Sequence, residues 1–163
     1  MDITVVRGDI CAVQADAVVT AGNRSLRGGS GVNGAIHAAA GPELQRASRA
    51  LAPCPVGSAV ITPAFRMENT SWVIHAVGPI YSGPDDEALL ACAYTASLAC
   101  ADEVGATSVA FPAISTGVYG YPPQDAARVS VAALRGAQTS VQRVLLVAYG
   151  EQTAVLWEQA LAS

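Results

Sequence analysis

Charged side chains are scarce in this sequence. They make up 13% of the 163 residues, whereas an ordinary soluble domain contains about 25%. Hydrophobic residues account for 52%, so the chain is not of the disordered type and can form a large core. The formal net charge of −4 excludes an overall basic surface. We therefore expect no membrane-surface partner and no nucleic acid, although a local basic groove is compatible with this charge.

Long apolar runs are also absent. No run approaches the roughly 18 residues that cross a bilayer, and Asp2 follows Met1 directly, so we expect neither a membrane span nor a secretory leader. The two histidines and four cysteines include no C-x-x-C pair, which argues against a disulfide framework and a zinc site. We expect reduced, mostly buried thiols in a cytoplasmic, monomeric protein with no metal and no cofactor.

Short β-branched runs alternate with helical patterns along the chain. Several of the runs are apolar throughout, as in strands that are buried on both faces of a sheet. This alternation predicts a single α/β domain over residues 1–163, with helices covering a largely parallel sheet. Predicted strands cover residues 3–7, 17–20, 59–62, 72–77, 108–111 and 143–148, and predicted helices cover 31–40, 43–51, 85–104, 122–136 and 153–161.

A glycine-rich stretch over residues 28–34 contains the spacing G-x-G-x-x-G. A dinucleotide fingerprint needs a strand directly before it and an acidic residue about 20 positions later. The preceding predicted strand ends near Thr20, and residues 50–55 are ALAPCP, so we reject the nicotinamide interpretation. Consecutive backbone N–H groups before a helix suit a phosphate; the alternative is a glycine turn without a ligand.

A second glycine loop, STGVYG at residues 115–120, favours the phosphate interpretation. It too follows the carboxyl end of a predicted strand, where open α/β sheets bind their ligands. Two such loops can hold both sides of a diphosphate through hydroxyls and amides, and Tyr119 offers a flat surface to a sugar or base. Asp9 follows the first predicted strand and is either a partner for a base amino group or a turn aspartate.

Six segments together resemble macrodomains of the MacroD type, in family order and over nearly the whole chain. They are GDI at 8–10, ADAVV at 15–19, GVNGAIH at 31–37, CPVG at 54–57, VIHAVGP at 73–79 and FPAISTGVYGYP at 111–122. The resemblance implies a three-layer α/β/α sandwich around a mixed, largely parallel sheet, with a cleft for ADP-ribose. Members of this family remove ADP-ribose from acidic protein side chains, deacetylate O-acetyl-ADP-ribose, or only bind the ligand.

The resemblance also assigns roles to individual residues. Asp9 would hold the adenine amino group beside the Ile10 backbone, and Tyr149 would lie against the adenine. Asn23 would hold the distal ribose, with Tyr119 packed beside it. The diphosphate would lie between two loops, formed by Gly29, Ser30, Gly31 and Val32 on one side and by Ser115, Thr116, Gly117, Val118 and Tyr119 on the other.

The sequence departs from the family pattern at four positions. Active relatives commonly read Asn-Ala-Ala-Asn where this chain reads Thr20-Ala21-Gly22-Asn23, and Ser30 stands in the glycine run. Asn33 occupies the position of the usual catalytic aspartate. An asparagine cannot act as a general base, and losing a general base typically costs about 10²–10⁴-fold in rate. Asn33 can still position a water through its carbonyl while a substrate phosphate takes the proton.

The resemblance therefore implies two alternative functions. The first is hydrolysis of ADP-ribosyl esters, with Asn23 and Asn33 as the catalytic residues and ADP-ribosylated proteins as partners. The second is a non-catalytic module that reads ADP-ribose. RNA binding in the same cleft is a weaker third, because the net charge is acidic. Arg24 either reaches a phosphate or acceptor carboxylate or is a solvated surface arginine, and we expect His37 and His75 to be packed, hydrogen-bonded structural residues.

Overall fold

Six short strands form one mixed sheet in the computed structural model, which describes all residues 1–163. The strand order is β1-β6-β5-β2-β4-β3. Every neighbouring pair is parallel except β3 and β4. This confirms the predicted mixed, largely parallel sheet. The strands are β1 (Asp2–Arg7), β2 (Ala17–Ala21), β3 (Ala59–Pro63), β4 (Trp72–Ala76), β5 (Ser108–Phe111) and β6 (Arg143–Ala148).

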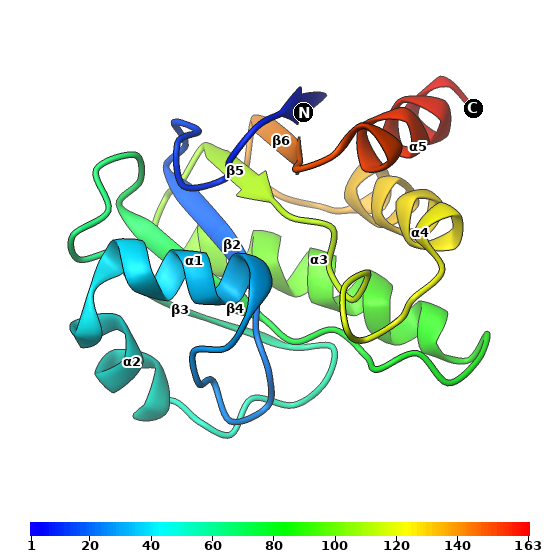
Figure 1. The fold of residues 1–163 in the computed structure, drawn as a ribbon. Coiled ribbons are helices and arrows are strands. Elements are labelled where there is room, and N and C mark those ends of the chain that lie inside the picture. The colour runs from blue at the N-terminus through cyan, green and yellow to red at the C-terminus, as the bar shows by residue number, and fades with distance from the viewer.

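Five helices cover the two faces of the sheet and complete the predicted three layers (Figure 1). One face carries α1 (Gly31–Ala40) and α2 (Pro42–Arg49), and the other carries α3 (Asp86–Glu103), α4 (Pro123–Gly136) and α5 (Glu151–Ala162). None of these helices combines the length and the apolar character that crossing a membrane requires.

The central strand β2 shows why its sequence is apolar throughout. Ala17 and Val19 belong to the larger core, with α3 to α5, whereas Val18 belongs to the smaller core, with α1 and α2. All three side chains are fully buried. A strand between two helical layers has no solvent face, so the alternation of polar and apolar residues disappears.

The boundaries of two helices differ from the prediction by two residues at one end, and the other boundaries differ by one residue at most. The second helix covers Pro42–Arg49 instead of 43–51, since proline is tolerated in a first helical turn and sets its own backbone angle there. The last helix begins at Glu151, two residues before the predicted start. An acidic side chain in the first turn suits the helix dipole, and the earlier start places Thr153 inside that turn.

The parallel pairing fixes where a ligand site forms. The carboxyl ends of β1, β6, β5 and β2 meet at one edge of the sheet. Neighbouring β5 and β2 lead in opposite directions, because β5 continues through α4 to β6 while β2 continues through α1 and α2 toward β3 and β4. Such a switch point opens a crevice at the carboxyl ends of the strands.

Candidate ADP-ribose site

A cleft of about 930 Å³ lies at this edge of the sheet. Its size is typical of small-molecule sites. Every residue that the sequence predicts to bind the ligand or to act in catalysis lines this cleft. These residues are Asp9, Ile10, Asn23, Gly29, Ser30, Gly31, Val32, Asn33, Ser115, Thr116, Gly117, Val118, Tyr119 and Tyr149. The structure therefore brings them together, while the ligand atom that each one contacts stays a prediction.

The cleft also contains residues that the sequence did not single out. Most are direct neighbours of predicted residues at the same strand ends. Gly78, after β4, and Thr153, in the first turn of α5, are not. Gly78 lies in the segment VIHAVGP directly after a predicted strand, a signal that could have found it, whereas nothing in the local pattern distinguishes Thr153. The remaining lining residues are Gly8, Ala21, Gly22, Ala35, Pro112, Ala113, Ile114 and Val147.

The first loop, residues 29–33, runs into the N-terminus of α1. The N–H groups of Gly31, Val32 and Asn33 donate no hydrogen bond within the chain, as expected in a first helical turn. Ser30 makes no side-chain capping bond, and no acidic side chain lies in the first turn. The partial positive charge of this helix end is therefore uncompensated next to the cleft, which suits a phosphate.

The second loop, residues 115–119, presents another row of donors. The N–H groups of Gly117, Val118 and Tyr119 donate no hydrogen bond. Ser115 has a φ of 68°, and its buried hydroxyl has no partner. The Tyr81 N–H donates to the Tyr119 carbonyl at 2.9 Å and fixes the end of the loop. Two loops with free donors in one cleft can bind both phosphates of a diphosphate.

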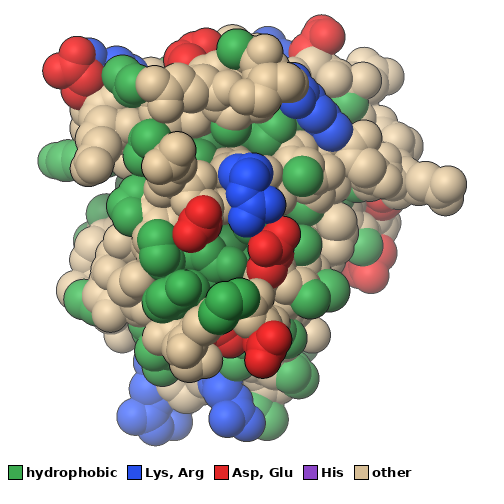
Figure 2. Space-filling view, turned by 90° about the vertical axis from the view of Figure 1, so that its right-hand side faces the viewer, with side chains coloured by type: hydrophobic (Ala, Val, Ile, Leu, Met, Phe, Trp, Pro, Cys, Tyr) green, Lys and Arg blue, Asp and Glu red, His purple; other side chains and the backbone are tan.

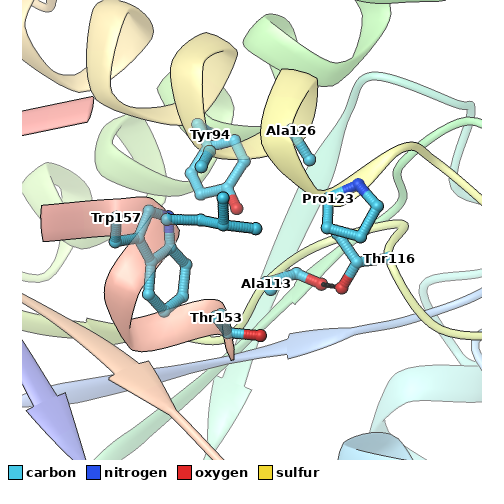
Figure 3. A pocket seen from close by; sticks show the side chains of 9 residues that line it. Tyr94, Ala113, Thr116, Pro123, Ala126, Thr153 and Trp157 are labelled. Carbon is cyan, nitrogen blue, oxygen red and sulfur yellow. Dashed lines mark hydrogen bonds between the residues drawn. The ribbon is translucent and has the colours of Figure 1, made fainter. Parts of the chain in front are cut away.

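A small cavity behind the second loop is a packing feature, not a second site (Figure 3). Its volume of about 10 Å³ leaves no room for more than one water molecule. The Tyr94 hydroxyl accepts from the Ile114 N–H at 3.2 Å and lies 3.3 Å from the Pro112 carbonyl, to which it donates. The Thr116 hydroxyl points to Ala113 and donates to its carbonyl at 2.8 Å (Figure 3). In this structure the turn uses the hydrogen of the Thr116 hydroxyl, and the predicted contact of this hydroxyl with phosphate stays a prediction.

Two glycines allow the loops to approach other backbone closely. A Cβ on Gly78 would lie 2.6 Å from Ile114 Cγ2 and would overlap the Ser115 hydroxyl. A Cβ on Gly34 would overlap the Gly29 carbonyl. Gly34 is the third glycine of the G-x-G-x-x-G spacing, and it lets α1 pack against the loop that precedes it.

Asn23 braces its own loop. Its Oδ1 accepts hydrogen bonds from the Ser25 hydroxyl at 2.8 Å and the Arg27 N–H at 3.1 Å, and its Nδ2 donates to the Arg27 carbonyl at 3.1 Å. From the sequence, only a ribose contact is predicted for this side chain. The amide keeps one Nδ2 hydrogen for such a contact, since each NH₂ group has two.

Asn33 is held in one orientation. Its Nδ2 donates to the Arg27 carbonyl at 2.9 Å, and its Oδ1 accepts from the Thr20 hydroxyl at 3.0 Å. A carbonyl can only accept, so the Arg27 contact decides which end of the amide faces which partner. Thr20 and Asn33, two of the departures from the family pattern, therefore contact each other. One lone pair of the Asn33 oxygen is free to hold a water.

The far end of the cleft carries Asp9 and Tyr149. One Asp9 carboxylate oxygen accepts a hydrogen bond from the Cys11 N–H at 2.8 Å. This oxygen therefore stabilises the turn, as one of the two predicted roles of Asp9 requires, and the other oxygen is available to a ligand. Ile10 is buried, and Asn69 donates to its carbonyl at 3.1 Å. Tyr149 is 86% exposed, so its ring is free to pack against a ligand.

Neither histidine lines the cleft. His75 is buried and hydrogen-bonded to the Thr62 hydroxyl at 3.0 Å, and burial lowers its pKa to about 4. This confirms the structural role predicted for His75. The buried Nε2 of His37 has no partner, so the predicted hydrogen bond of His37 is wrong; burial lowers its pKa as well.

The contact of Gly78 with the second loop leads to a stability prediction. We expect Gly78→Ala to destabilise the fold by about 1–3 kcal/mol, because the added methyl group overpacks the site around Ser115 and Ile114. Gly83→Ala is the matched control, since a Cβ there meets no atom within 4 Å. Urea unfolding measures both variants. Equal free energies of unfolding for the two would contradict the close contact.

Two solved structures are similar to the chain over nearly its full length. One is a mutant Oceanobacillus iheyensis macrodomain with ADPR, with a TM-score of 0.92 and 37% identity over 97% of this chain and 90% of that one. The other is a Trypanosoma brucei macrodomain in complex with ADP-ribose, with a TM-score of 0.89 and 32% identity over 98% of this chain and 68% of that one.

Sequence comparisons agree with the structural ones. A macro domain-containing protein of Ralstonia nicotianae is 46% identical over 157 residues, covering 95% of this chain and 91% of the relative. An O-acetyl-ADP-ribose deacetylase of Klebsiella pneumoniae is 45% identical over 168 residues, covering 98% and 95%. The Macro domain family matches residues 19–130. The chain therefore belongs to the Macro domain family.

Proposed function

We propose that this macrodomain binds ADP-ribose and hydrolyses the ester that links it to an acyl group. The acyl group is the acetyl of O-acetyl-ADP-ribose, or an aspartate or glutamate side chain of a mono-ADP-ribosylated protein. The observation that carries the proposal is a pair of loops that line one cleft and whose N–H groups are unpaired within the chain. Relatives named O-acetyl-ADP-ribose deacetylase and macrodomains solved with ADP-ribose support it.

The strand order supports an extended pose for the ligand. Asp9 follows β1, Tyr149 follows β6, the second loop follows β5, and Asn23 follows β2. These four strands are neighbours, so their ends cover three strand spacings, or about 14 Å. In this pose the adenine lies at the β1 and β6 end, the diphosphate lies over β5 and the N-terminus of α1, and the distal ribose lies beside Asn23 and Asn33.

The reaction needs one water and a proton acceptor. Hydrolysis gives the free carboxylic acid and ADP-ribose, and the proton that the water releases must go to a group other than the amide of Asn33. We assign it to a phosphate oxygen of the bound diphosphate, which passes it on to the departing ribose oxygen so that ADP-ribose leaves with its hydroxyl restored. Asn33 orients the water through its carbonyl oxygen. The unpaired N–H groups of the two loops stabilise the negative charge of the diphosphate. The four unpaired thiols fit a cytoplasmic location for this reaction.

A reader of ADP-ribose without catalysis is the second candidate. The observation that favours it is the amide at position 33, because both sides of this amide already have partners in the chain. A reader retains all of the binding geometry and releases no product.

Turnover of O-acetyl-ADP-ribose separates the two candidates. We expect the wild type to release ADP-ribose slowly, and Asn33→Asp to release it at least about tenfold faster, because a carboxylate supplies the missing base. Chromatography of the products measures both rates, and calorimetry with ADP-ribose confirms that each protein binds. If the wild type binds ADP-ribose but releases none from the substrate over hours, the non-catalytic ADP-ribose reader is the candidate that remains. An unchanged rate in Asn33→Asp would show that the water is not held at this position.

Thr20 is a positioning residue for Asn33. We expect Thr20→Val to lower kcat several-fold with little change in KM, because the valine is nearly isosteric and removes only the hydroxyl that orients the Asn33 oxygen. Thr62→Val is the matched control, since it removes a buried hydroxyl with one side-chain partner, His75, outside the cleft. Each variant loses about 1 kcal/mol of stability. A kcat that falls equally in both variants would assign the effect to stability alone.

A further inference from the structure

Two arginines beside the cleft have no acidic partner. Arg24 and Arg27 are exposed, and the only ion pair of the chain joins Arg128 to Glu87. Both arginines belong to the connection between Asn23 and Gly29, two residues that line the cleft. Their guanidinium groups are thus free to bind a partner from outside.

The backbone that carries these arginines is firmly held. The Arg27 carbonyl accepts from both Asn23 Nδ2 and Asn33 Nδ2, at 3.1 and 2.9 Å. The Arg24 carbonyl accepts from the Cys54 N–H at 2.8 Å. Between them Leu26 is fully buried. The arginines are therefore presented from a fixed loop, which lowers the entropy cost of binding a partner.

Helix α2 adds a third free arginine to this surface. Gln45 Nε2 and the Ser48 hydroxyl both donate to the Leu26 carbonyl, at 3.1 and 2.8 Å. Arg49 follows Gln45 by four positions, so it lies on the same side of the helix as the loop. It is exposed and has no carboxylate partner. We call Arg24, Arg27 and Arg49 the arginine rim.

The charge around the rim is opposite to that of the molecule as a whole. Residues 24–66 contain five of the nine arginines and a single acidic residue, Glu43, whereas the whole chain has a net charge of −4. Figure 2 shows acidic side chains around one basic group in the middle of a face, with further basic side chains at its lower edge and near its top.

We propose that the arginine rim is a docking surface for an acidic polypeptide segment next to the ADP-ribosylated side chain. This rests on the proposed function, and it specifies the substrate class. The acyl group leaves the distal ribose at the end of the cleft where Asn23 and Asn33 lie. The side-chain amides of both residues donate to the Arg27 carbonyl, so Arg27 lies next to this end of the cleft. Carboxylates two or three residues from the modified side chain then meet guanidinium groups, which bind them in bidentate fashion.

A longer polyanion fits this surface less well than a short acidic segment. The rim is local, and the net charge of −4 opposes a nucleic acid that extends beyond it. Binding of RNA to the arginine rim is therefore treated as an alternative outcome of the test below.

The test compares two labelled peptides of equal length. Each carries one ADP-ribose through a stable linkage at its centre, flanked by glutamates in one peptide and by glutamines in the other. Fluorescence anisotropy gives the Kd of each. We expect the acidic peptide to bind about three- to tenfold more tightly at low salt, and the preference to shrink as salt rises, because exposed ion pairs are weak and screened.

Two variants with the same net charge locate the effect. Arg24→Gln/Arg27→Gln should lose the preference for the acidic peptide and keep the affinity for free ADP-ribose within about twofold, since neither side chain lines the cleft. The matched control is Arg135→Gln/Arg143→Gln, because Arg135 lies at the end of α4 and Arg143 at the start of β6, away from the strand ends that form the cleft. This variant should keep the preference.

The outcomes separate the docking surface from the catalytic proposal. Equal binding of the two peptides, or equal loss of the preference in both variants, overturns the docking surface. It is also overturned if a short single-stranded RNA binds through the rim while the two peptides bind alike. If the preference is present and depends on the rim but O-acetyl-ADP-ribose is not hydrolysed, the docking surface stands and only the catalytic proposal fails.

Discussion

The parallel pairing of β1, β6, β5 and β2 is the constraint on which the cleft depends. Parallel strands place their carboxyl ends at one edge, so four loops that are far apart in sequence become neighbours. Their spatial order sets the order of the groups in the cleft, from Asp9 and Tyr149 at one end to Asn23 and Asn33 at the other. The antiparallel β3 lies at the opposite edge of the sheet and takes no part in this arrangement.

The donors that face the cleft are backbone groups, and the fold keeps them unpaired at a cost. Ser115 takes a left-handed backbone conformation, which costs about 1–3 kcal/mol for a residue other than glycine. Gly78 and Gly34 have no side chain, and this absence lets Gly78 lie against Ser115 and lets Gly34 lie against the Gly29 carbonyl. In return, the two loops keep fixed N–H groups for an anion without a basic side chain, in a chain whose overall charge is acidic.

The fold and the lining of the cleft were predictable because both follow from local patterns. Apolar runs such as Val18–Val19 indicate strands, and strand ends indicate where ligands bind. The contacts within the site were not predictable in this way. Thr20 and Asn33 are 13 positions apart, and only the packing of α1 on β2 brings them together. The approach of Gly78 to Ser115 likewise depends on how two loops pack, and no spacing in the sequence encodes it.

Calorimetric titration with ADP-ribose and AMP tests the central claim most directly, because AMP keeps the adenine contacts and lacks the diphosphate and the distal ribose. Hydrogen bonds to charged groups contribute about 1.5–3 kcal/mol each. If the unpaired N–H groups of the two loops bind the diphosphate, ADP-ribose should bind at micromolar concentration and AMP at least about 100-fold more weakly. Equal affinities for the two ligands, or no binding of ADP-ribose, would contradict the account.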